Sequence, residues 1–160
     1  MAEVTINKMM KLSEHFTLAE LCKTSAKTAD GNIPSHVHIE NLKNLCENWL
    51  EPLRQRYNKP ILINSGYRSE AVNKAIGGVK GSNHLTGCAV DIRVLGLEQA
   101  IRYACILLDI ADEKELDFDE LLIERSPKGT FWLHFAVRPK DNRRKVRFIQ
   151  TQFIHLRDRF

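Results

Sequence analysis

Two histidines and one aspartate in apolar surroundings are the residues whose types and spacing could do chemistry. His84 and Asp91 lie seven positions apart, on either side of the turn residue Gly87. His134 comes later, in the middle of the apolar stretch 131–137. An ionised aspartate in so apolar a segment is costly unless it has a charged partner or a metal. Two imidazoles and one carboxylate, with a fourth position left open, suit a catalytic zinc ion.

Both of these segments alternate as β-strands do, so each offers a ligand-type side chain on one face. In residues 88–94, Asp91 shares its face with Ala89. In residues 131–137, His134 is likewise flanked by an alanine on its own face. A single histidine on an apolar strand is more often a hydrogen-bonded core residue, and an aspartate after a turn is more often a cap. Spacing alone therefore leaves a metal site and an ordinary core both open.

Longer motifs surround these residues. They are Ser82-x-His84-x-x-Gly87-x-Ala89-x-Asp91 and Trp132-x-His134, with Ser65-Gly66-Tyr67-Arg68-Ser69 and Asn73-x-x-Ile76-Gly77-Gly78 upstream. Together these motifs resemble those of the zinc D-alanyl-D-alanine carboxypeptidase family, which also includes phage endolysins that cut peptidoglycan peptides. The match runs from about Phe16 to Val137.

The resemblance implies one zinc ion held by His84, Asp91 and His134. Such a metal polarises the scissile carbonyl and lowers the pKa of its bound water to about 7. The resemblance also implies that Ser82 and Arg68 contact the substrate, with Arg68 binding the substrate or the oxyanion during catalysis. Tyr67 is a further substrate contact on the same grounds.

The general base is where this sequence departs from part of the family. Several members have a glutamate or aspartate three residues before the last histidine, and here that position is Phe131. Strand alternation across the expected hairpin puts Glu120 and Glu124 on the face of His134. We predict Glu124 as the base, with Glu120 as the second choice. The alternative is that both are solvated carboxylates at the rim.

The expected architecture is a single α+β domain of the Hedgehog/DD-peptidase kind. With 160 residues, 43% hydrophobic and 28% charged, the chain suits one soluble domain with a sizeable core. We expect an antiparallel sheet carrying the zinc site, with helices packed on one face. Residues 1–15 are predicted to be an N-terminal extension, and residues 16–160 to be the zinc peptidase domain.

Two helices are predicted from hydrophobic periodicity. One begins at Pro34-Ser35 and buries a stripe at spacings of three and four residues, with Pro52 as a site for a kink. The other spans 97–109. Its inward residues are predicted to be Ala100, Ile101, Ala104, Cys105 and Leu108.

The cysteines do not indicate a second metal site. None forms a Cys-x-x-Cys pair, and each sits among apolar residues. All four, Cys22, Cys46, Cys88 and Cys105, are expected to pack as reduced small hydrophobes.

Charge and targeting signals limit the partners. The net charge is +4, which is too small to argue for nucleic acid but could favour an anionic cell wall. The basic run 138–145 is read as a solvated turn. The N-terminus lacks the apolar core of a signal peptide, and no stretch approaches the roughly 20 apolar residues of a membrane span. We expect a monomer made in the cytoplasm that acts on the cell wall after release or export.

The predicted activity is hydrolysis of peptidoglycan peptides containing D-amino acids. The sequence leaves open a D-Ala-D-Ala carboxypeptidase and an endolysin-type endopeptidase. A zinc-binding module without catalysis is the alternative from another class, because Hedgehog signalling domains resemble this fold and retain a similar metal site. A structural domain without metal is a weaker third possibility.

Overall fold

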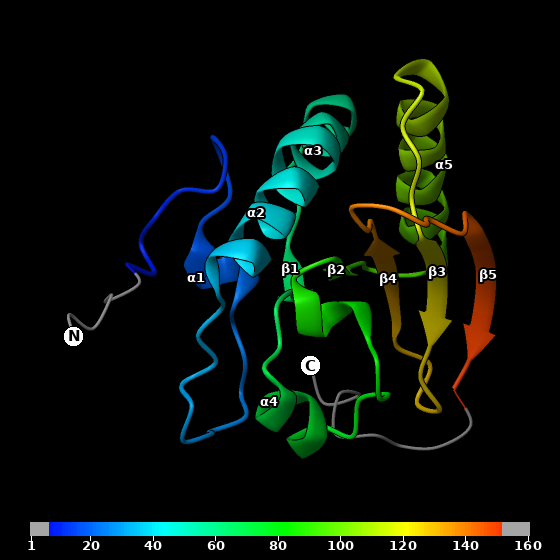
Figure 1. Cartoon of the computed structure of the whole chain (residues 1–160). Coiled ribbons are helices and arrows are strands. Elements are labelled where there is room, and N and C mark those ends of the chain that lie inside the picture. Colours follow the sequence, from blue (N-terminus) through cyan, green and yellow to red (C-terminus); the bar gives the residue numbers. More distant parts are fainter. Residues whose placement is uncertain (1–6, 152–160) are drawn as a thin grey trace.

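A five-stranded sheet forms the centre of the computed structural model, which describes residues 7–151 (Figure 1). Its order is β1-β2-β4-β3-β5. All neighbouring strands run antiparallel except β3 and β5, which are parallel, so the sheet is mixed. The strands are β1 (Ile63–Ser65), β2 (Ala89–Arg93), β3 (Glu120–Arg125), β4 (Phe131–Ala136) and β5 (Lys145–Gln150).

The prediction of a purely antiparallel sheet is therefore wrong at the edge formed by β5. The β3–β4 hairpin returns the chain to the end of the sheet where β3 begins. The short link 137–144 passes around that end, so β5 starts opposite the first residue of β3, with Lys145 paired to Glu120. Because β5 begins at the same end of the sheet as β3, it runs in the same direction as β3.

Helical segments make up most of the remaining described chain. A capping box at Thr17 starts the first, and Ser35 caps the second. The run from α2 to α3 continues through a π-helical turn just before Pro52, the residue that cannot donate a helical hydrogen bond. The segments are α1 (Leu18–Leu21), α2 (His36–Leu45), η1 (Cys46–Leu50), α3 (Glu51–Tyr57), α4 (Glu70–Ala75), η2 (Asn83–Thr86) and α5 (Leu97–Glu113).

The hydrophobic core lies between these helices and one face of the sheet. Trp49 of η1 packs on Phe135 of β4 with ring centroids 4.9 Å apart, and its edge meets Phe118 at 6.3 Å. Alternation along β2 and β4 places Val90 and Leu133 in this core. Their neighbours on the same strands point to the opposite face. The predicted division of each strand into a core face and a ligand face is confirmed.

The buried face of α5 differs from the prediction. Ala100 is buried as expected, and Ala104 and Leu108 are partly buried against the core. Ile101, however, is 46% exposed, and Cys105 is also exposed. The ring of Tyr103 packs edge-on against Tyr57, with the ring centroids 4.8 Å apart. The face of α5 that carries Tyr103 is therefore turned towards the core, in place of the face that carries Ile101 and Cys105. The buried set is Ala100, Tyr103, Leu107, Ile110 and Ala111.

The cysteine prediction holds for three of the four residues. Cys22, Cys46 and Cys88 are buried with free thiols. Cys105 is also free but lies exposed on α5, so for it the prediction of a packed hydrophobe is wrong.

The N-terminal segment is joined to the domain through Leu12. This side chain is buried in the core, and its amide donates to the carbonyl of Phe16. The boundary between residues 15 and 16 and the Hedgehog/DD-peptidase fold name stay predictions. None of the helices in residues 7–151 is long and apolar enough to cross a membrane.

Candidate metal centre

Three ligand-type side chains meet on the face of the sheet opposite the core. Asp91 of β2 and His134 of β4 lie directly opposite each other in the strand register. His84 comes from η2, the turn that leads into β2. That turn ends at Gly87, whose φ is +72° and whose added Cβ would lie 2.5 Å from the carbonyl oxygen of His38. Glycine is therefore required for the chain to bring His84 back beside Asp91.

The ligating atoms of these residues are within metal-binding reach of one another. One potential ligand atom from each lies within 4.8 Å of the others, and all three side chains are buried. Oδ1 of Asp91 is 2.9 Å from Nδ1 of His134 and 3.3 Å from Nε2 of His84. A donor set of two nitrogens and one oxygen fits zinc with a fourth position left for solvent or substrate.

The tautomer of His84 supports a cation at this position. Its Nδ1 donates to the carbonyl of Gly66 at 2.7 Å. In the neutral ring, Nε2 then carries no proton and has a free lone pair. Nε2 is buried and has no hydrogen-bond partner among the described residues. That lone pair faces Oδ1 of Asp91, another acceptor, at 3.3 Å. Two buried acceptors facing each other need a positive charge between them, and a metal ion supplies it.

The pKa values of these groups follow from the same packing. Burial lowers the pKa of His84 to about 4, which keeps it neutral as a ligand must be. Burial alone would raise the pKa of Asp91, but the two histidines hold it well below its usual range. Burial alone would lower the pKa of His134, yet its bonds to Asp91 and Glu120 raise it to about 9. A metal and a proton compete for this imidazole.

Arg68 lies behind Asp91, on the side away from the histidines. Its Nη2 donates to Oδ2 of Asp91 at 2.9 Å, and its Nε donates to Ser65 at 3.0 Å. Its Nη1 donates to Asn73 at 3.2 Å. An added Cβ at Gly78 would lie 2.0 Å from Oδ1 of the same asparagine. The structure thus shows Arg68 bonded to a candidate ligand, and its predicted contact with the substrate stays a prediction.

The two other predicted substrate contacts differ in position. Ser82 lines the cleft beside the ligands, and its hydroxyl accepts from the amide of His84 at 3.2 Å. Tyr67 is buried in the core, where its ring stacks on His38 at 5.0 Å. The geometry gives Tyr67 a packing role beside the site, and a contact with substrate stays a prediction.

A cleft of about 370 Å³ opens beside the ligands, and both candidate bases line it with His84 and His134. The register pairs Glu124 with Trp132 and Glu120 with Ala136, which places both carboxylates on the face of His134 as predicted. Glu124 is only 6% exposed, and its negative charge contributes to the raised pKa of His134.

Several polar and charged neighbours hold the carboxylate of Glu120. Its Oε1 accepts from Asn83 at 2.8 Å and lies 3.6 Å from both His134 and Arg143. The nearby imidazole of His134 is the main reason why the pKa of Glu120 is lowered. A carboxylate held ionised in this way is a poor proton acceptor.

The strand pairing shows why residue 131, three positions before the last histidine, does not face the candidate ligands. The pairing of β3 with β4 is unbroken from Phe131 to Ala136. Regular alternation therefore places Phe131 on the face opposite His134, where its ring lies 6.4 Å from that of Phe148. A carboxylate at residue 131 would point away from the metal ligands unless the strand carried a bulge.

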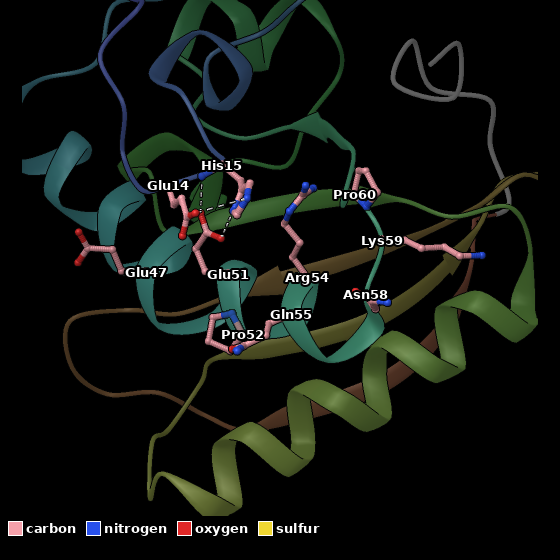
Figure 2. A pocket seen from close by; sticks show the side chains of 10 residues that line it. All are labelled: Glu14, His15, Glu47, Glu51, Pro52, Arg54, Gln55, Asn58, Lys59 and Pro60. Carbon is pink, nitrogen blue, oxygen red and sulfur yellow. Dashed lines mark hydrogen bonds and ion pairs between the residues drawn. The ribbon is translucent and has the colours of Figure 1, made fainter.

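A larger cavity lies elsewhere and shares no residue with this site. It measures about 610 Å³ and is lined by residues of the N-terminal segment, of η1 and α3, and of the link 58–60 (Figure 2). There Glu51 accepts from the backbone amide of His15 at 2.7 Å and meets its ring nitrogen at 2.8 Å. These contacts tie the N-terminal segment to α3, and the cavity holds none of the candidate ligands.

A comparison of the sequence with models of protein families identifies the family of this chain. Residues 14–113 match the model of Peptidase M15, which is more than half of the chain. The chain belongs to the peptidase M15 family. The matched part includes His84 and Asp91, whereas Glu124 and His134 follow it in the sequence. The predicted family resemblance is confirmed.

One relative is the zinc D-Ala-D-Ala carboxypeptidase of Streptomyces albus G. It is 31% identical over 96 residues, which cover 55% of this chain and 37% of the relative. The chain thus matches little more than a third of that protein's length. The predicted single zinc cofactor agrees with the family, with this zinc-dependent relative and with the one candidate metal site found among residues 7–151.

Proposed function

We propose that this M15 peptidase hydrolyses peptidoglycan peptides containing D-amino acids, with zinc held by His84, Asp91 and His134. The observation that carries the proposal is the buried cluster itself, in which the lone pair of His84 and the carboxylate of Asp91 face each other without a hydrogen between them. The D-amino-acid substrate is taken from the relative's activity. We place the action at the cell wall, after release or export of the protein.

Residues in the cleft and behind it have distinct tasks in this reaction. Bound zinc would polarise the scissile carbonyl and supply hydroxide at neutral pH. Glu124 accepts the proton of the attacking water and returns it to the leaving amine, a contribution of typically 10²–10⁴-fold. The carbonyl of Gly66 fixes the tautomer of His84, and Arg68 fixes the orientation of Asp91.

Glu120 is disfavoured as the base because of its surroundings, which leaves Glu124 as the preferred candidate. Asn83, Arg143 and Lys145 all approach the carboxylate of Glu120, and each stabilises its ionised form. Glu124 lies on the same strand face, two residues farther along, and is equally part of the cleft wall. A base near the reacting water needs a pKa closer to neutrality than such a network allows.

The test is a digest of purified peptidoglycan by the zinc-loaded protein, read by mass spectrometry. Release of free D-alanine indicates a carboxypeptidase, and shortened or uncrosslinked stem peptides indicate an endopeptidase. Glu124→Gln is expected to retain zinc while losing at least about 100-fold in kcat. Glu98→Gln, on the exposed surface of α5, is the matched control and should retain full activity.

The alternative function, a zinc-binding module without catalysis, makes the opposite prediction. Phe131 at the position where several relatives carry their base is the feature that favours it. A protein that binds one zinc ion and binds peptidoglycan, yet releases no product, would establish this alternative and refute the proposed hydrolysis.

A further inference from the structure

The basic run 138–145, read from the sequence as a solvated turn, instead forms one wall of the cleft beside the metal ligands. Arg138, Arg143 and Lys145 line the same cleft as His84 and His134. The link between β4 and β5 brings them there, because it passes around the end of the sheet where β3 begins.

These cations lie close to the reacting centre. Oε1 of Glu120 is 3.6 Å from Nε2 of His134 and also 3.6 Å from Nη2 of Arg143. The two nitrogens are therefore at most about 7 Å apart. Because neighbouring Cα atoms of a peptide are about 3.8 Å apart, a substrate group that reaches the wall lies one or two residues from the scissile bond.

A buried carboxylate holds the wall in shape. Asp119 is fully buried, and it accepts two hydrogen bonds from the side chain of Arg143 at 2.8 and 2.9 Å. Nε of Arg138 lies 3.2 Å from Asp119 and donates to Asn83 at 3.0 Å. Neither terminal amino group of Arg138 makes a hydrogen bond to another residue in the described part of the chain. Both arginines keep a third to a half of their side chains exposed.

The charges of the site leave it positive once the metal is bound. Four basic side chains surround the centre: Arg68, Arg138, Arg143 and Lys145. Four acidic side chains balance them: Asp91, Asp119, Glu120 and Glu124. The excess charge is therefore that of the zinc ion itself. A substrate that brings a carboxylate into the cleft is favoured over its neutral counterpart.

We propose that Arg138, Arg143 and Lys145 form a subsite that binds a carboxylate of the substrate, one or two residues from the scissile bond. This inference rests on the proposed function. The carboxylate can be the free C-terminus of the peptide or the side chain of an acidic residue next to the cleavage site. Guanidinium and ammonium groups bind either through charge-assisted hydrogen bonds.

The experiment compares substrates that differ only in this charge. One pair is a tripeptide ending in D-Ala-D-Ala, with a free C-terminal carboxylate or a C-terminal amide. The other is a stem peptide with an internal glutamyl side chain, free or amidated. The pair in which the parent protein prefers the acid identifies the source of the carboxylate.

The variants are Arg138→Gln and Lys145→Gln, alone and combined. Each is expected to raise KM for the acid about 3- to 10-fold, with the KM of the amide, the kcat and the bound zinc unchanged. Arg144→Gln is the matched control, because this neighbour pairs with Asp112 outside the cleft and should alter neither substrate.

Binding is measured in parallel, by calorimetry on the zinc-loaded Glu124→Gln protein. This keeps failure of the subsite distinct from failure of the proposed activity. If the parent cleaves nothing but the acid still binds more tightly than the amide and loses that preference in Lys145→Gln, hydrolysis fails and the subsite stands. Equal binding of acid and amide, or an equal loss on both in the variants, overturns the subsite even where cleavage is observed.

Discussion

Replacement of Asp119 by asparagine tests whether this buried carboxylate stabilises the fold through its ionised form. Burial alone would raise the pKa of Asp119, but hydrogen bonds from Arg143 and Asn83 outweigh it and lower the pKa from 3.8 to about 2. One pKa unit is worth about 1.4 kcal/mol, so the ionised carboxylate contributes about 2 kcal/mol at neutral pH. Asp119→Asn should lose about that much unfolding free energy.

The loss should not reach the roughly 3–5 kcal/mol seen when a buried ion pair is broken. Arg143 and Arg138 are 48% and 33% exposed, so water solvates their charges when the carboxylate is gone. For a protein of this size, about 2 kcal/mol corresponds to a fall in Tm of about 4–8 °C.

The sign of the pH dependence follows from the lowered pKa. The contribution of Asp119 is fully present above its unfolded pKa of about 3.8 and is lost as the pH falls through about 2. Urea unfolding of parent and variant, followed by circular dichroism between pH 7 and pH 2, measures it. The difference between the two proteins should stay near 2 kcal/mol down to about pH 4 and then shrink.

Asp117→Asn is the control, since this exposed carboxylate lies two residues away and 3.9 Å from Arg144. It should change stability by less than about 0.5 kcal/mol. A difference between Asp119→Asn and the parent that stays constant down to pH 2, or that never exceeds the control, would refute the assignment of this stability to ionised Asp119.

Three further predictions concern the metal centre and its support. His84→Ala and His134→Ala should each lose stoichiometric zinc by elemental analysis, and the zinc-dependent rise in Tm of the parent should vanish with it. Arg68→Ala should weaken zinc binding by about 10–100-fold in a chelator competition, because Arg68 orients Asp91; unchanged affinity would return Arg68 to a role in substrate binding alone. Gly66→Ala should destabilise the fold by about 1–3 kcal/mol in urea, because its Cβ would lie 2.3 Å from the carbonyl oxygen of Leu21; a variant as stable as the parent would show that this contact yields easily.

Strand alternation is the part of the site that the sequence could predict. Period-two patterning in 88–94 and 131–137 places Asp91 and His134 on one face, and the register sets them opposite each other. The same rule places Glu124 on that face from β3. These predictions depend only on the geometry of a pleated strand, which every residue of a regular strand shares.

Features that depend on contacts distant in sequence could not be read in this way. The face of α5 is set by the packing of Tyr103 on Tyr57, and periodicity alone favoured Ile101 and Cys105. The parallel pairing of β5 depends on the path of a short link around the sheet. The path of this link also determines where its basic residues lie. The local sequence does not show this, because a basic run can form a solvated turn or line a cleft.

If Glu124 is the base, as proposed, the regular pairing of β4 gives the physical reason for its place on another strand. A residue three positions before a histidine on an unbroken strand must lie on the other face, as Phe131 does. A peptidase with its base at that position therefore needs a bulge or an irregular turn between the base and the ligand. A chain that keeps the strand regular must supply the carboxylate from another segment. Glu124, paired with Trp132 on the face of His134, meets that requirement while Phe131 packs on the opposite face.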